Sequence, residues 1–245
     1  HGMNIGATTV GGMINNVKTF ASVLMPGVQH MRHTHLPEHK FVKGEPDTGV
    51  EMAEDLERIA MNFGGENIAA CIIEPIAGST GTLVPPKGYL KRIRDICDKH
   101  GILLIFDEVI TGWGRTGSAF AAQEWNVTPD IMTMAKATTN GVVPMGVVAV
   151  KEEIYDSVLD ASSAPEGTPE LFHGYTYSGI PVAVAAALAV QDIFDKEDLI
   201  KRAKEMSPYF QDGLHSLKDL KEVVSIRGYG MMGGIEINMR EKPGK

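Results

Sequence analysis

The chain has 245 residues, of which 43% are hydrophobic and 22% charged, and its formal net charge at pH 7 is −8. This composition is typical of a globular protein, with room for one large domain or for a domain and part of another. An acidic balance without a Lys/Arg cluster argues against nucleic acid and anionic membranes as partners. No apolar run approaches the roughly 18 residues of a membrane-spanning helix, and no signal-peptide pattern opens the chain. Cys71 and Cys97 lie in apolar contexts and are predicted to be buried free thiols, which favours the reducing cytoplasm.

The N-terminal part of the chain is predicted to be irregular. Glycines interrupt any period in the first stretch, and residues 20–49 carry three prolines that are typical of a long surface loop. Four histidines fall within this loop, at His30, His33, His35 and His39. Histidine clusters can bind zinc, but no carboxylate or cysteine with suitable spacing accompanies these, so a solvated loop is favoured.

From residue 50 onward, helical and extended patterns alternate. Apolar spacing predicts a helix over 50–63, capped by Asp47 and Thr48, and the continuous apolar run at 68–73 predicts a strand buried on both faces. A second helix is expected after the prolines at 85–86 and before Gly101, followed by a strand at 102–106. This strand–helix–strand order predicts right-handed crossovers and a mostly parallel sheet with helices on both faces.

The second half of the chain continues this α/β pattern. The expected elements are strands at 131–134 and 144–150, a helix at 152–159, a Ser/Pro/Gly loop at 161–170, helices at 181–194 and 198–217, and short strands at 223–226 and 234–238. The helix at 181–194 is rich in Ala and Val on all sides, which predicts a buried helix.

Two polar residues each follow a short strand of buried type. Asp107 ends the apolar run at 102–106, and Lys136 follows the run at 131–134. Either residue alone is common in α/β proteins, as a strand-terminal acid or a solvated lysine. Together they are more informative, because ligands bind beyond the carboxyl ends of strands in open α/β sheets. An amine that forms a Schiff base with an aldehyde, and a carboxylate that keeps a ring nitrogen protonated, are what a pyridoxal phosphate enzyme requires.

The segments that contain these residues have a family resemblance. Residues 103–117 and 130–146 resemble the signature of class III aminotransferases, the omega branch of the fold-type I pyridoxal phosphate enzymes, and the resemblance continues through 174–181. Within that family the chain is most similar to the beta-alanine:pyruvate type. The resemblance implies a fold-type I large domain over residues 1–195, then a connecting helix and the start of a C-terminal small domain over 196–245. It also implies pyridoxal 5'-phosphate as cofactor and a homodimer.

The resemblance assigns roles to residues at the strand ends. Lys136 is implied as the catalytic lysine, which forms the Schiff base and moves the proton, and Asp107 as the partner of the ring nitrogen. Val109 is expected to point the same way as Asp107 and to contact the ring face, although core packing also explains a valine there. Glu74 is expected near the cofactor's phenolic oxygen or a substrate-side arginine. Arg115 is expected to fix its loop.

A further motif is implied to serve the neighbouring subunit. Thr176 resembles the threonine that reaches across the family's dimer to the cofactor phosphate, and the neighbouring Tyr175 is also expected to bind the cofactor. A hydroxyl and a backbone N–H before a helix suit that anion. A capping role for Thr176 remains the alternative.

The implied function is transfer of an amino group from an omega-amino acid or amine to a keto acid such as pyruvate, by a ping-pong mechanism. Two alternatives stay open: another class III reaction (an aminomutase, decarboxylase or racemase), and a noncatalytic fragment. The cofactor supplies the chemistry in all class III reactions, so the motif does not separate them. The opening residues resemble the end of an aromatic-His-Gly motif, and the last strands resemble the start of the small domain. We therefore expect an internal fragment that lacks both termini and, alone, lacks normal transaminase turnover.

Overall fold

The computed structural model describes residues 2–162 and 173–238. Its α-helices are α1 (Ile5–Val10), α2 (Ile14–Thr19), α3 (Glu54–Phe63), α4 (Tyr89–His100), α5 (Ala121–Glu124), α6 (Glu152–Ala161), α7 (Pro181–Lys196) and α8 (Leu199–His215). Its strands are β1 (Ala70–Ile73), β2 (Leu103–Asp107), β3 (Ile131–Met134), β4 (Val147–Val150), β5 (Val223–Tyr229) and β6 (Met232–Ile237). Short 3₁₀ turns include η3 (Val50–Ala53) and η5 (Lys136–Thr138). None of the helices in these ranges is long and apolar enough to cross a membrane.

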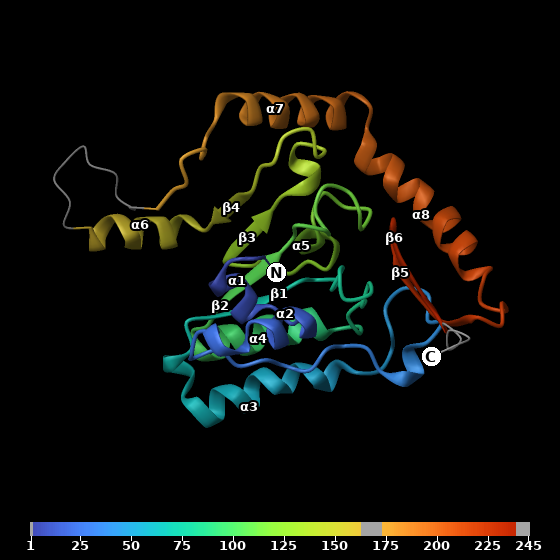
Figure 1. The fold of residues 1–245 in the computed structure, drawn as a ribbon, viewed down its shortest axis with the longest axis horizontal. Helices are drawn as coiled ribbons and strands as arrows, with labels where there is room; N and C mark the ends of the chain where they lie inside the picture. The colour runs from blue at the N-terminus through green and yellow to red at the C-terminus, as the bar shows by residue number, and fades with distance from the viewer. Residues whose placement is uncertain (1, 163–172, 239–245) are drawn as a thin grey trace.

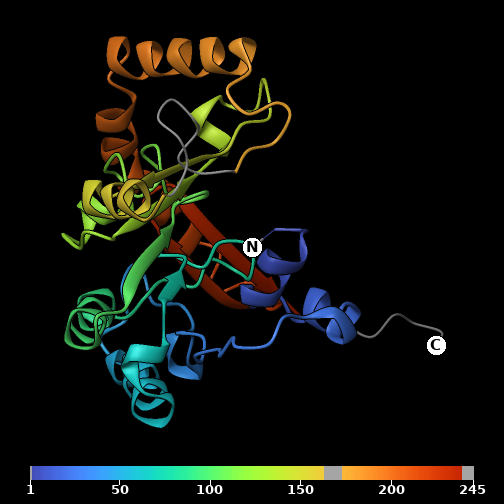
Figure 2. The ribbon, with the colours of Figure 1, turned by 90° about the vertical axis from the view of Figure 1, so that its left-hand side faces the viewer.

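The main sheet has the strand order β1-β2-β3-β4. The first three strands are parallel and β4 runs antiparallel to β3, which confirms the predicted mostly parallel sheet. The two C-terminal strands form a separate antiparallel hairpin. Figures 1 and 2 place α7 at one end of the molecule and α3 at the opposite end, with the main sheet between them.

The hydrophobic core lies between one face of the sheet and helices α3 and α4 (Figure 1). These two helices are the predicted ones, and their apolar stripes face the strands. A helix of this length is marginal alone in water, so packing of the stripe against the sheet is what stabilises it. The core side chains include Met52, Leu56, Ala60, Cys71, Leu90, Ile93, Ile96, Cys97, Leu104 and Phe106. Both cysteines are buried free thiols, as predicted.

The opposite face of the sheet is only partly covered. Leu103 and Ile105 alternate with the core residues of β2 and are half-buried, and Ile72 of β1 is 39% exposed. The prediction that the 68–73 strand is buried on both faces is therefore wrong for the described residues. A continuous apolar run indicates that both faces of a strand are suited to burial. Whether a second layer covers the other face depends on contacts with segments far away in the sequence.

The N-terminal region is more regular than its glycines indicated. Two short helices, α1 and α2, replace the expected irregular stretch, and the Asn4 side chain caps α1 by accepting a hydrogen bond from Ala7 N at 2.7 Å. The helix predicted over 50–63 begins with η3 after Gly49, whose φ of +107° suits glycine, and not after an Asp47 or Thr48 cap. Within the predicted surface loop, His39 is buried.

Helix α7 forms as predicted but is not a buried helix in this chain. Ala183 and Ala187 are buried, whereas Val182 and Leu188 are 56% and 60% exposed. Apolar residues on all sides of a helix predict that other segments pack against all of its sides. The described residues pack against only one stripe of α7. Helix α8 then leads to the hairpin (Figure 1), where the two predicted C-terminal strands pair with each other. The expected loop at 161–170 lies, from residue 163 onward, outside the described residues.

Candidate active site

The carboxylate of Asp107 lies at the carboxyl end of β2, on the open face of the sheet. Its Oδ1 atom accepts hydrogen bonds from Val109 N at 3.0 Å and from Thr133 Oγ1 at 3.2 Å. Thr133 is the register partner of Asp107 on β3, so the two side chains share one face. Sequence reasoning missed Thr133. The available signal was the hydroxyl of Thr133 within the apolar run 131–134, on the strand that follows the one ending at Asp107.

Lys136 begins the tight turn η5 directly after β3. Its φ is +49°, in the left-handed region that residues other than glycine rarely adopt. Backbone strain of this kind clusters at functional sites and persists only where the surroundings hold it. The Lys136 side chain is exposed, and its carbonyl accepts a hydrogen bond from Gly141 N at 3.2 Å.

Glu74 follows β1, so the third parallel strand also ends in a polar residue. Its Oε2 atom accepts a hydrogen bond from Gly78 N at 2.9 Å. Burial raises the pKa of Glu74, the Asp107 charge raises it further, and the Gly78 N–H and the charge of Lys136 oppose the rise. Glu74 follows β1, Asp107 ends β2 and Lys136 follows β3, at the same end of three neighbouring parallel strands, and these residues are called the strand-end group. Val109 N contacts Asp107.

Thr176 and Tyr175 lie in the exposed turn before α7. The turn is held by its own contacts: Tyr175 N donates to Ser178 Oγ, and Ser178 N donates to the Tyr175 carbonyl, both at 2.9 Å. Within the described residues, neither Thr176 nor Tyr175 hydrogen-bonds to the strand-end group. The Tyr175 side chain is 73% exposed.

The residue after Asp107 is a buried carboxylate that sequence reasoning also missed. Glu108 is fully buried, and it accepts hydrogen bonds from Thr111 Oγ1 at 2.6 Å, Ala121 N at 2.9 Å and Ala122 N at 2.8 Å. Burial raises the pKa of Glu108, while these three donors favour its ionised form. It thus closes the loop after β2 and caps α5. Strand alternation, which points Glu108 away from Asp107 and into the core, was the available signal.

The glycine-rich segment 114–117 supports the same loop. Arg115 Nη1 donates to the Ile110 carbonyl at 3.1 Å, which confirms its expected role in fixing the loop. The Arg115 carbonyl in turn accepts a hydrogen bond from Met231 N at 2.8 Å. A Cβ atom at Gly230 would lie only 2.4 Å from the Arg115 carbonyl oxygen. The turn of the C-terminal hairpin is therefore seated directly on this segment.

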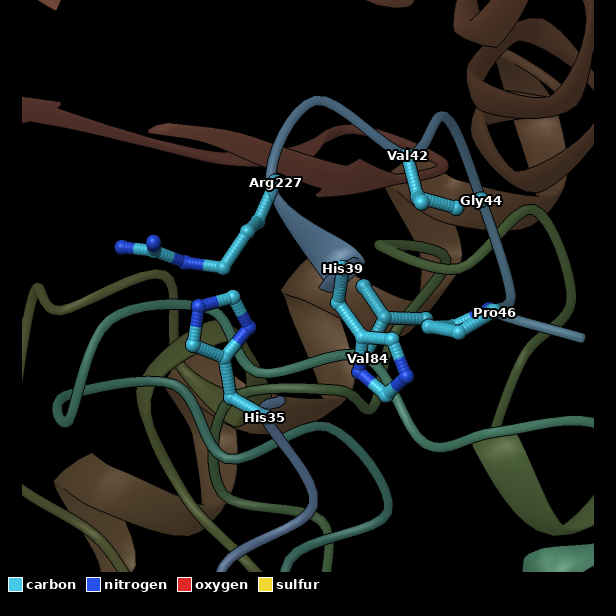
Figure 3. Close-up of a pocket in the computed structure, with 7 residues that line it drawn as sticks. All are labelled: His35, His39, Val42, Gly44, Pro46, Val84 and Arg227. Carbon is cyan, nitrogen blue, oxygen red and sulfur yellow. The ribbon is translucent and has the colours of Figure 1, made fainter. Parts of the chain in front are cut away.

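The cavity in Figure 3 shares no residue with the strand-end group of Glu74, Asp107 and Lys136. Its lining residues are His35, His39, Val42, Gly44, Pro46, Val84 and Arg227, and its volume is about 10 Å³. That is near the ~10–15 Å³ that one water molecule occupies, so the cavity is a packing junction and not a substrate site. Arg227 lies beside His35 (Figure 3) and donates to the Gly81 carbonyl at 2.8 Å. No histidine-containing group of metal-ligand type occurs in the described part of the chain.

The strand-end group fits one cofactor chemistry. Lys136 offers an exposed amine for an aldehyde, Asp107 a held carboxylate for a ring nitrogen, and the open sheet face an apolar surface beside them. Two of these groups lie at the carboxyl ends of adjacent parallel strands, where ligands bind in α/β sheets.

Comparison with known proteins gives the family. The class-III aminotransferase family model matches residues 1–244, and the chain belongs to this family, whose members depend on pyridoxal phosphate. It is 52% identical over 98% of its length to an omega-aminotransferase of Caulobacter vibrioides and 47% identical over 98% to a beta-alanine–pyruvate aminotransferase of Pseudomonas aeruginosa. These alignments cover 54% and 53% of the two relatives, so the chain spans about half of their length.

Solved structures agree on the fold. A transaminase with L-alanine matches with a TM-score of 0.88 at 32% identity, over 99% of this chain and 58% of that one. The omega transaminase of Pseudomonas jessenii in complex with PMP matches with a TM-score of 0.86 at 32% identity, over 97% of this chain and 52% of that one. The predicted α/β fold of the fold-type I transferases is confirmed.

Proposed function

We propose that the protein carrying this chain transfers an amino group from an omega-amino acid or amine to a keto acid such as pyruvate, using pyridoxal 5'-phosphate. One observation carries the proposal: Lys136 and Asp107 lie at the carboxyl ends of adjacent parallel strands, beside an open apolar sheet face. The substrate classes are those named for the omega-aminotransferase and the beta-alanine–pyruvate aminotransferase relatives.

Each residue of the strand-end group has a chemical role in the proposal. Bound pyridoxal phosphate supplies an aldehyde for amines and a protonated ring that withdraws electrons. Lys136 Nζ holds the cofactor between turnovers and, once released, carries the proton removed from the substrate carbon. Asp107 keeps the ring nitrogen protonated, and the two hydrogen bonds to its Oδ1 fix the carboxylate for that task. Val109 would line the ring face, and Glu74 would lie near the phenolic oxygen or a substrate-side arginine.

The reaction proceeds in two halves. When bound, the cofactor would carry nitrogen between the amine donor and the keto acid, so that each half would need a proton moved at the substrate carbon. Lys136 serves both halves, because the same side chain moves the proton in each direction. Residues 1–195 supply the large domain for this chemistry, and residues 196–245 begin the small domain.

A homodimer follows from the same proposal. Thr176 and Tyr175 stand exposed at the start of α7 and would contribute to the phosphate site of a second copy. The exposed apolar residues of α7, including Leu188 at 60%, would be covered in that assembly. Cys71 and Cys97 are both free thiols, which suits a protein of the reducing cytoplasm.

The test is product analysis of the full-length protein with pyridoxal phosphate, pyruvate and beta-alanine or a primary amine. Alanine should form in a one-to-one ratio with the carbonyl product of the donor, and initial-rate plots should be parallel, as in a ping-pong mechanism. The matched control is Lys136→Arg, which keeps the positive charge but should abolish alanine formation. Consumption of the donor by decarboxylation or racemisation without alanine would contradict transamination and favour another class III reaction.

A further inference from the structure

Two residues in the loops after β2 and β3 have a left-handed backbone conformation. Trp113 has a φ of +61° in the loop after β2, and Lys136 has a φ of +49° in the turn after β3. For a bulky side chain this conformation is strained, and the surrounding contacts must hold it in place. The two strained residues lie on the two loops that carry the carboxylate and the amine.

A side-chain bridge connects these loops. Trp113 Nε1 donates to Thr138 Oγ1 at 3.0 Å, and Thr138 Oγ1 donates to the Ala135 carbonyl at 3.1 Å. Thr138 is 2% exposed, so its hydroxyl is shielded from water. The indole can only donate, and the hydroxyl both accepts and donates, so one arrangement satisfies both groups. Through Thr138, the indole N–H thus fixes the peptide immediately before Lys136.

The Trp113 ring is itself held firmly. It packs edge-on against Phe120, with ring centroids 5.2 Å apart, and lies 6.1 Å from the Phe194 ring of α7. The Trp113 backbone N donates to the Ala119 carbonyl at 2.6 Å. The ring packing needs only an aromatic side chain, whereas the bridge to Thr138 needs the indole N–H. A phenylalanine at position 113 therefore separates the two contributions.

We propose that Trp113 is a positioning residue for Lys136: its indole N–H, acting through Thr138, holds the lysine turn so that the amine meets the cofactor aldehyde. The inference rests on the proposed function, because it assumes that Lys136 captures pyridoxal phosphate. It predicts that loss of the N–H slows capture at Lys136 without weakening the noncovalent contacts of the cofactor.

The experiment measures covalent and noncovalent binding separately in the full-length protein. Pyridoxal phosphate capture is trapped with borohydride at timed intervals and quantified on the Lys136 peptide by mass spectrometry. Pyridoxamine phosphate, which has no aldehyde and cannot attach to the lysine, reports the remaining contacts by calorimetry. Trp113→Phe should slow capture about 2–10-fold, the range expected for one neutral hydrogen bond, and should leave pyridoxamine phosphate affinity within about twofold.

Matched variants make the result specific. Trp125→Phe removes the other indole N–H of the chain, which donates to Glu45 Oε1 at 2.7 Å, and should capture the cofactor at the wild-type rate. Thr138→Ser keeps the hydroxyl and should also behave as wild type. Thr138→Val should slow capture, and adding Trp113→Phe to it should cause no further loss.

The outcomes distinguish the two proposals. If the wild-type protein captures no pyridoxal phosphate at Lys136, the proposed function and this inference both fail. If the wild type captures it and Trp113→Phe does so equally fast, only the inference about Trp113 is overturned. An equal loss of capture and of pyridoxamine phosphate affinity would also overturn it, because that pattern indicates general damage to the site. Should Trp113→Phe not fold, the comparison of Thr138→Val with Thr138→Ser decides the question.

Discussion

Asp107 and Glu108 are adjacent acids with opposite surroundings. Strand alternation points Asp107 to the open face, where Val109 N and Thr133 Oγ1 hold it, and points Glu108 into the core, where three donors surround it. Asp107 lies on the open face of the sheet, and Glu108 shapes the loop that follows. Of these two consecutive acids, Asp107 is the one for which we propose a chemical role, whereas Glu108 has a structural one.

Substitution of Asp107 tests the chemical role. Asp107→Asn keeps the size of the side chain and an oxygen that can accept the two hydrogen bonds made to Oδ1, but removes the charge that would keep the ring nitrogen protonated. We expect kcat for alanine formation to fall on the order of 10²-fold, similar to the loss of one preorganised electrostatic contact. Steady-state kinetics check this, with Asp47→Asn as control, since the Asp47 side chain is 82% exposed. An Asp107→Asn enzyme within twofold of wild type would rule out the role.

At the scale of elements, one carboxylate joins three segments around the main sheet. Asp130, at the start of β3, accepts hydrogen bonds from Leu104 N of β2 at 2.7 Å, Arg94 Nη1 of α4 at 2.8 Å and Lys151 Nζ after β4 at 2.6 Å. Burial opposes ionisation of this carboxyl, but the hydrogen bonds from Lys151, Leu104 and Arg94 outweigh it and lower the pKa of Asp130. This clamp fixes the relative positions of the strands that end at the candidate site.

Removal of the Asp130 charge should destabilise the fold in a pH-dependent way. Asp130→Asn should lower the free energy of unfolding at pH 7 by about 1.5–3 kcal/mol, typical of hydrogen bonds to a charged group. A carboxyl with a lowered folded-state pKa stabilises the fold above its ordinary pKa of about 4, and this contribution disappears as the pH falls through the lower folded value. The difference between variant and wild type should therefore shrink towards pH 3.

Denaturant unfolding at pH 7 and pH 3 measures this effect. The surface pair of Lys91 and Asp95 on α4 offers the control, because Asp95→Asn should cost at most about 1 kcal/mol. A loss for Asp130→Asn that is equally large at both pH values would show that the variant disturbs packing and not the charge.

The sequence predicted what depends on local pattern. Helices α3 and α4, strands β1 to β3 and the positions of Asp107 and Lys136 follow from apolar periodicity, glycine stops and strand ends. What it missed depends on contacts between distant segments. Thr133 acquires its role from the register with β2, and the buried face of α7 is set by its packing on η5. The short α1 helix was missed because the glycines outweighed the cap at Asn4.

At the scale of the whole molecule, apolar surface remains uncovered. Ile72 on the sheet and Val182 and Leu188 on α7 are 39%, 56% and 60% exposed. Exposed large apolar side chains such as those on α7 are the kind of surface that interfaces cover. The turn with Thr176 immediately precedes α7, so an interface there would also bring this turn to a second copy.

A charge on α7 tests the proposed dimer. Leu188→Glu places a carboxylate in the expected interface, where it would lose its hydration without a partner. We expect light scattering to show a dimer for the full-length wild type and a shift to monomer for this variant. Met61 of α3 is 72% exposed, and α3 lies at the opposite end of the molecule from α7. Met61→Glu should therefore leave the mass unchanged. A wild-type monomer, or a Leu188→Glu dimer of undiminished stability, would exclude α7 as the interface.

The proposed transamination and the proposed role of Trp113 both require covalent capture of the cofactor by Lys136. The direct measurement is peptide mass spectrometry after incubation with pyridoxal phosphate and reduction with borohydride. The predicted result is a pyridoxyl group on Lys136 in near-stoichiometric yield, with the other lysines, such as Lys151, essentially unmodified. An unmodified Lys136 in folded full-length protein, or equal labelling of many surface lysines, would contradict the assignment of this site.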